Sequence, residues 1–181
     1  MNTVFLDRFE GQVINELLKL CTSFNILEGQ LLITDDFDEL WKKHAPEYVA
    51  DAVKEIKDYP SVALAWAAYL GMGVANGWDK DFEAAQKATY RSYYGPRGFD
   101  DMDEHIVGDI LGYAINGPDA NRLRQVLQSC AQMAEDMIRH EQIEPQSEMA
   151  FHVFARAVKA LFKIGVSIEL KRLNYKFERV Q

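Results

Sequence analysis

The stretch SVALAWAAYLGMGVANGW, residues 61–78, decides the fold because it contains no charged side chain. An apolar helix of this length could span a lipid bilayer. Three glycines and an asparagine lower its hydrophobicity, however, and the charged residues 79–81 follow at once. We therefore predict a buried central helix at about 61–77 and do not expect a membrane as a partner.

Small residues recur every four positions along this predicted central helix. They are Ala63, Ala67, Gly71 and Ala75. Positions four apart lie on one face of a helix, and side chains this small leave that face flat. We expect another helix backbone to approach the strip unusually closely.

Apolar residues at helical spacing continue on both sides of the central stretch. In residues 3–24 they alternate at spacings of three and four, and residues 118–140 show one clear apolar stripe. The expected helices cover residues 3–24, 36–42, 46–59, 61–77, 79–94, 100–116, 118–140 and from 145 onward. We predict an all-α fold, an irregular bundle of about six or seven helices around the central helix, in a single domain over residues 1–181.

Capping residues and prolines set the boundaries of these expected helices. Asp36, with Glu39 three residues later, is typical of a helix start, and Pro46 is expected to open a separate helix. Asp79 is expected to cap the helix that ends at 94. Beyond Gly165 the apolar pattern loosens, which leaves the conformation of residues 166–181 open.

The charge balance limits the expected partners. Twenty Lys and Arg against 28 Asp and Glu give a formal charge of −8. Contact with phosphate backbones needs a basic face, so nucleic acid is not expected as a partner. The N-terminal residues lack the basic and apolar regions of a secretion signal, which favours a cytoplasmic location.

Two cysteines, Cys21 and Cys130, lie on apolar stripes of separate expected helices. No C-x-x-C spacing is present. Buried thiols behave as small apolar side chains of low reactivity. We therefore interpret both as parts of the core rather than as a disulfide or a metal pair.

Asp101, Glu104, His105 and Asp109 form the best metal candidate in the sequence. Their spacing places carboxylates and an imidazole along neighbouring helix positions. The apolar residues of the same segment lie on the opposite side, so these four side chains are expected to face water. No Glu-x-x-His motif, nucleophile elbow or phosphate loop is present. We therefore assign no catalytic residue, metal or cofactor.

The aromatic segment at residues 90–94 is harder to explain by core packing than the rest of the sequence. Three tyrosines fall within five residues, with one arginine among them and a second in the turn that follows. Such a surface could recognise a ligand or a protein, since arginine stacks on rings and binds carboxylates. Tyrosines that cap the core with their hydroxyls in water are the alternative. The candidate ligand or partner surface comprises Trp66, Tyr69, Trp78, Tyr90, Tyr93, Tyr94 and Arg97.

Charge is also segregated along the chain. Residues 28–58 hold nine acidic side chains against four lysines, whereas residues 156–179 hold seven basic against two acidic. Solvated faces of opposite sign would explain this pattern. The sharper hypothesis is that the basic end docks on the acidic segment of its own chain or of a symmetry mate.

Two functional hypotheses remain from the sequence. The first is a non-catalytic interaction or regulatory protein that self-associates as a homo-oligomer or binds another protein. The second is a small-molecule-binding helical protein or enzyme, with a pocket near Trp66, Trp78 and Tyr94. The sequence favours the first hypothesis and leaves the ligand or partner unidentified.

Overall fold

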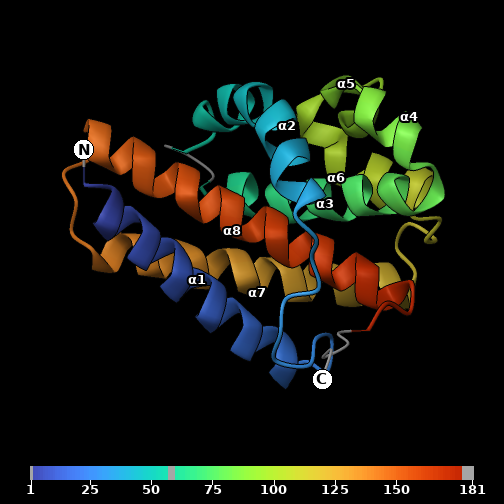
Figure 1. The fold of residues 1–181 in the computed structure, drawn as a ribbon, viewed down its shortest axis with the longest axis horizontal. Coiled ribbons are helices and arrows are strands. Elements are labelled where there is room, and N and C mark those ends of the chain that lie inside the picture. The colour runs from blue at the N-terminus through green and yellow to red at the C-terminus, as the bar shows by residue number, and fades with distance from the viewer. Residues whose placement is uncertain (1, 57–59, 177–181) are drawn as a thin grey trace.

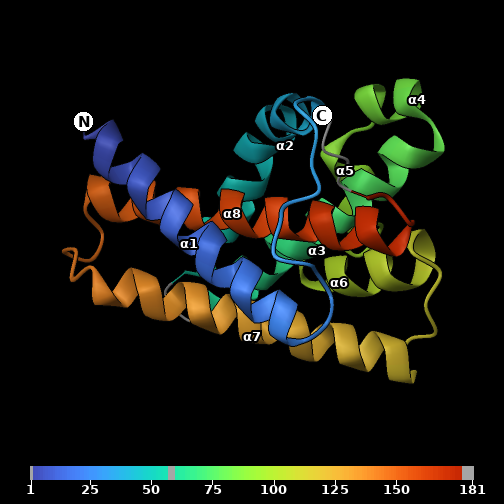
Figure 2. The same cartoon turned by 60° about the horizontal axis from the view of Figure 1, so that its bottom comes forward.

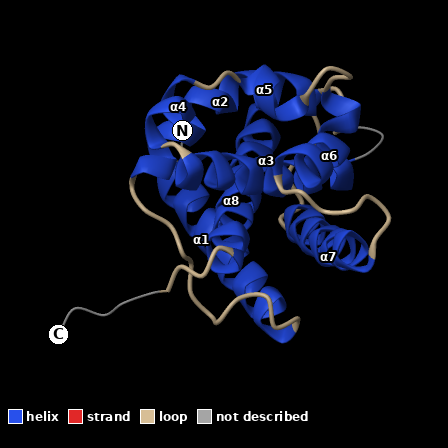
Figure 3. Cartoon of the chain, turned by 90° about the vertical axis from the view of Figure 1, so that its right-hand side faces the viewer, coloured by secondary structure: helices blue, strands red, loops and turns tan. Residues whose placement is uncertain are grey.

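The computed structural model describes residues 2–56 and 60–176, and over these residues the chain is helical, without a β-strand (Figure 3). The α-helices are α1 (Thr3–Ser23), α2 (Asp36–Val53), α3 (Pro60–Lys80), α4 (Phe82–Lys87), α5 (Tyr90–Tyr94), α6 (Met102–Glu104), α7 (Pro118–His140) and α8 (Glu148–Arg172). A 3₁₀ turn at Phe99–Asp101 precedes α6, and a π-helical turn at His105–Ile110 follows it. The all-α prediction is confirmed.

Helix α3 is the buried centre of the bundle, as its uncharged sequence predicted. Its side chains from Ala63 to Asn76 are buried, except for the partly exposed Trp66. Helix α8 packs along it, with α1 and α7 on one side of this pair and the shorter helices on the other (Figures 1 and 2). No helix in the described ranges is both long and apolar enough to cross a membrane.

Two glycines allow α3 and α8 to touch backbone to backbone. A Cβ atom added to Gly71 would overlap the carbonyl oxygen of Phe162, and one added to Gly165 would overlap that of Ala68. The strip of small residues on α3 therefore does mark a very close helix contact, and α8 supplies the second glycine. Only a residue without a side chain allows this separation.

A loop between α1 and α2 crosses the outer face of α8 (Figures 1 and 2). The buried hydroxyl of Ser167 accepts a hydrogen bond from the Leu32 amide at 3.0 Å and donates one to the Leu32 carbonyl at 3.1 Å. On the same side, Lys171 pairs with Glu28 at 2.7 Å. Part of the basic end thus contacts the acidic segment of its own chain, while residues 177–181 lie outside the described residues.

Helix α2 corrects the prediction of two helices divided at Pro46. It runs unbroken from Asp36 to Val53, and Pro46 lies inside it on the exposed side. The buried residues Leu40, His44 and Tyr48 continue at helical spacing past the proline. A proline inside a helix removes one hydrogen bond, and here the packing of the opposite face outweighs that loss.

The region after α3 also differs from the prediction. Helix α3 continues through Asp79 to Lys80, and Asp81 rather than Asp79 caps α4, accepting a hydrogen bond from the Ala84 amide at 3.1 Å. The expected helix at 79–94 is divided into α4 and α5. The expected helix at 100–116 becomes short turns that end at Gly112, whose φ of +80° suits glycine.

The last helix is longer than its sequence pattern indicated. Helix α8 continues past Gly165 to Arg172, and residues 164–170 are all buried. Glu169 belongs to this buried segment although it is charged, since Asn76 and Arg172 hydrogen-bond to its carboxylate. The apolar pattern looked interrupted here because it includes Glu169 and Arg172, which bind each other.

Replacing Gly165 with alanine should lower the free energy of unfolding by about 3 kcal/mol, because α3 and α8 must move apart to admit the new Cβ atom. Gly11→Ala is the matched control, since Gly11 is an exposed position of α1 with no atom within 4 Å of an added Cβ. That change should be neutral or stabilising by up to about 1 kcal/mol. Urea unfolding measures both. Equal midpoints for the two variants would contradict the close contact.

Candidate functional site

The seven residues of the predicted aromatic surface have very different exposures. Tyr69, Tyr90 and Tyr93 are buried in the core. Trp66, Trp78 and Tyr94 are partly buried, and Arg97 is exposed. The structure therefore does not place the seven on one continuous exposed surface, and binding by the exposed members stays a prediction.

The tyrosines of α5 join that short helix to α2. The Tyr90 ring lies edge-on to Tyr48, with centroids 6.3 Å apart, and its hydroxyl donates to Asp51 at 2.9 Å. Burial, followed by the Asp51 charge, raises the pKa of Tyr90 far above its usual range. Burial also raises the pKa of Tyr93 to about 12. Both hydroxyls therefore stay protonated at neutral pH and serve packing.

The polar groups of the remaining members bind other parts of the chain. The indole nitrogen of Trp66 donates to the Phe99 carbonyl at 3.0 Å, and that of Trp78 donates to Asp36 at 2.7 Å. The guanidinium of Arg97 pairs with Glu104 at 3.1 Å and with Asp101 at 3.6 Å. The carboxylates that Arg97 was expected to find on a ligand are thus present in its own chain.

The predicted metal candidates pair with other groups rather than with one another, apart from one contact. Asp101 and Glu104 bind Arg97. His105 lies 2.9 Å from Asp109 through Nδ1 and 3.0 Å from the Ser92 carbonyl through Nε2. Over residues 2–56 and 60–176, no three His, Cys, Asp or Glu side chains are placed to hold one ion.

The pairing of His105 with Asp109 superficially resembles part of a serine hydrolase site. In such a site the second imidazole nitrogen faces the serine hydroxyl. Here that nitrogen faces the main-chain carbonyl of Ser92, and the Ser92 hydroxyl donates to the Thr89 carbonyl at 2.6 Å. The histidine therefore fastens the end of α5 against the π-helical turn and does not activate a nucleophile.

The best-formed apolar site was not predicted from the sequence. A groove of about 840 Å³ lies where the C-terminal ends of α2 and α7 meet the N-terminal ends of α3 and α8, at the end of Figure 1 where α8 begins. Its rims carry Val53 and Phe151, which are 41% and 43% exposed. The described lining residues are Val53, Ile56, Pro60, Leu64, Glu135, Ile138, Arg139, Gln142, Ile143, Pro145, Gln146, Ser147, Ala150, Phe151 and Phe154.

The described lining of the apolar groove carries almost no net charge. Glu135 and Arg139 are the only charged residues among the described lining, and they form an ion pair across one turn of α7. Ser147 uses its hydroxyl to cap α8, accepting a hydrogen bond from the Ala150 amide at 3.1 Å. The groove therefore offers a neutral, mainly apolar surface with amide side chains at its edge.

A tight connection between α7 and α8 shapes one wall of the groove. Gln142 and Gln146 both adopt positive φ, +54° and +62°, which reverses the chain over a few residues. Ile143 and Pro145 lie between them and line the groove. This part of the lining is thus built by local turns, whereas α2 and α3 contribute Val53 and Leu64.

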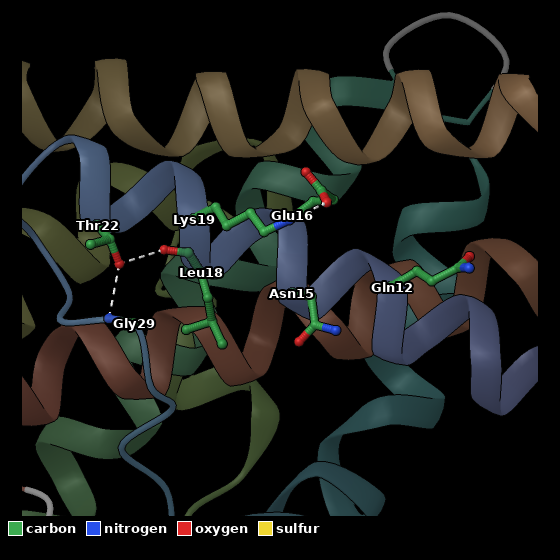
Figure 4. A pocket seen from close by; sticks show the side chains of 7 residues that line it. All are labelled: Gln12, Asn15, Glu16, Leu18, Lys19, Thr22 and Gly29. Carbon is green, nitrogen blue, oxygen red and sulfur yellow. Dashed lines mark hydrogen bonds and ion pairs between the residues drawn. The ribbon is translucent and has the colours of Figure 1, made fainter.

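The hollow on the outer face of α1 is a weaker candidate (Figure 4). It measures about 500 Å³ and is lined mainly by polar side chains. The Thr22 hydroxyl donates to the Leu18 carbonyl at 2.7 Å and accepts from the Gly29 amide at 2.9 Å, and Lys19 pairs with Glu16. These contacts occupy the polar groups of Thr22, Lys19 and Glu16, three of the residues that could hold a ligand.

The buried histidine next to the aromatic residues should make stability depend on pH. His44 is 1% exposed, its Nε2 has no hydrogen-bond partner among the residues that the structure describes, and burial lowers its pKa from 6.5 to about 4. The unfolded chain therefore takes up a proton below pH 6.5 that the folded chain does not bind until about pH 4. This difference should remove about 3 kcal/mol of stability as the pH falls through that window.

Replacing His44 with phenylalanine should abolish this contribution. Urea unfolding at several pH values between 4 and 7 measures it, with the wild type as the reference. The variant should lose less stability than the wild type on acidification. Parallel curves for the two proteins would show that the histidine is protonated in the folded state or is reached by water.

Comparisons with known proteins place this chain in no family. No family model matches the sequence, and no curated protein or solved structure matches it either.

Proposed function

We propose that this chain is a non-catalytic interaction or regulatory protein of the cytoplasm that self-associates through the apolar groove. The observation that carries the proposal is the exposure of large apolar side chains around a formed hollow. Val53 and Phe151 are both partly exposed and both line a cavity of about 840 Å³. Apolar patches with polar edges are typical of interaction surfaces.

The charge of the groove favours a second copy as its occupant. A patch that meets itself around a two-fold axis brings the same charges together, so a strongly charged patch would repel its copy. Here the described lining holds one acidic and one basic side chain, which neutralise each other. The chain as a whole carries −8, so contact between copies should be least unfavourable at this neutral surface.

The shape of the patch also suits a symmetric contact. It combines a projecting ring, Phe151, with a hollow deep enough to reach the buried residues Leu64 and Phe154. In a symmetric dimer the projecting group of each copy can enter the hollow of the other. Aromatic anchors of this kind supply most of the binding energy in many interfaces.

A small apolar molecule is the second candidate occupant, because a volume near 840 Å³ falls within the range of ligand pockets, about 300–1,000 Å³. The small-molecule hypothesis therefore applies to the apolar groove rather than to a pocket near Trp66, Trp78 and Tyr94. Neither tryptophan lines the hollow that includes Tyr94, which measures about 520 Å³ and opens beside His105.

Phe151→Ser should weaken self-association about 30-fold, as expected when an aromatic anchor worth about 2 kcal/mol is lost. Sedimentation equilibrium measures the dissociation constant. Phe82→Ser is the matched control, since Phe82 is 46% exposed on α4, away from the groove. Added salt should strengthen the wild-type dimer, because it screens the repulsion between two copies of charge −8.

A wild-type chain that stays monomeric at high concentration would overturn self-association. Titration with an apolar fluorescent dye then tests the second candidate. Dye binding by the monomer that is lost in Phe151→Ser and kept in Phe82→Ser would identify a small-molecule groove. Circular dichroism of each variant shows whether the fold is intact.

A further inference from the structure

The two cysteines of the chain face each other in the core. Cys21 lies near the end of α1 and Cys130 in the middle of α7, 109 residues later. Their sulfur atoms are 3.6 Å apart, and both side chains are fully buried. The sequence interpretation of two separate core residues did not foresee this contact.

We infer that Cys21 and Cys130 form a redox modification site, at which a hydroperoxide oxidises the two thiols to an intramolecular disulfide that ties α1 to α7. Disulfide formation needs two sulfurs held together, which the packing of these helices already provides. In a reducing cytoplasm the thiols are the resting state, so the cross-link would report oxidative conditions.

A crevice between α1 and α7 is lined by residues that neighbour both cysteines in the sequence, although the cysteines themselves are fully buried. It measures about 680 Å³, and its lining includes Leu20 and Ser129, the residues that precede the two cysteines. Met133, one turn after Cys130 on α7, lines the crevice as well. A hydroperoxide is small enough to enter such a space, and a slight opening between the helices would then expose the sulfurs.

The two cysteines have different roles in the proposed reaction. A hydrogen bond between the two sulfurs, which either thiol can donate, lowers the pKa of Cys21 and raises that of Cys130, and burial adds to the rise at Cys130. We assign Cys21 as the thiol that attacks the peroxide. Cys130 is the resolving thiol.

The reaction balances without any further reactant. The Cys21 thiolate attacks the peroxide oxygen, the O–O bond breaks, and an alcohol leaves with a proton, which gives a sulfenic acid. The Cys130 sulfur then attacks the Cys21 sulfur, and the hydroxyl group leaves as water with the Cys130 proton. Two thiols and one hydroperoxide become a disulfide, an alcohol and water.

The cross-link should stabilise the fold because it closes a loop of 109 residues in the unfolded chain. We expect the thermal midpoint to rise by about 10 °C on oxidation and to return on reduction with dithiothreitol. This consequence does not depend on the apolar groove, so it can fail or succeed independently of self-association.

The experiment treats the purified protein with tert-butyl hydroperoxide a few degrees below its thermal midpoint, where the seam between α1 and α7 opens often. The expected product is a monomer two mass units lighter, without free thiols, whose non-reduced peptide map joins the peptides of Cys21 and Cys130. The map also separates this change from oxidation of Met133. Cys21→Ser and Cys130→Ser should each give no intramolecular cross-link.

Three results would overturn the inference. They are two thiols that remain free under these conditions, sulfinic or sulfonic acids without a cross-link, and a disulfide that joins two molecules. Since the wild-type chain alone gives these readouts, the test holds even if a serine variant fails to fold.

Discussion

The backbone contact between α3 and α8 at Gly71 and Gly165 is the constraint on which the rest of the structure depends. Each glycine lies against a carbonyl of the other helix, at Phe162 and Ala68. A shift of either helix by one residue would bring a side chain into the place of a glycine. The contact therefore fixes the register of the two helices, and the other elements pack against a pair that cannot slide.

The buried polar groups of α8 are satisfied only in this register. Asn76 of α3 donates to Glu169 at 2.9 Å, while Arg172 binds the same carboxylate. Ser167 holds the loop at Leu32 through two hydrogen bonds. A buried carboxylate without partners would cost several kcal/mol, so a slipped register would lose stability twice, through steric overlap and through unpaired polar groups.

The sequence predicted the positions of the helices better than it predicted which helices pack against one another. The strip ending at Gly71 and Ala75 indicated a close helix contact, because small side chains at helical spacing have that consequence in any helix. Pro46 was misread because its penalty is local, whereas the packing that keeps α2 intact comes from residues far along the chain. The tyrosines at 90 and 93 were expected to be exposed for the same reason. Only the fold shows that α2 covers them, through Tyr48 and His44.

The apolar groove could not be predicted, because its residues follow apolar stripes that look like core. Val53 and Ile138 lie on such stripes, and they are left partly exposed where the ends of four helices meet.

The crossing of α3 and α8 explains why the groove is open at this end of the bundle. The two helices run in the same direction, since Ala68 meets Gly165 and Asn76 meets Glu169. They touch at the glycines, and Pro60 lies about 16 Å back along α3 from that point, at 1.5 Å per residue. Helices that cross at an angle separate over such a distance, so the close contact that makes the core tight also opens the groove at its end.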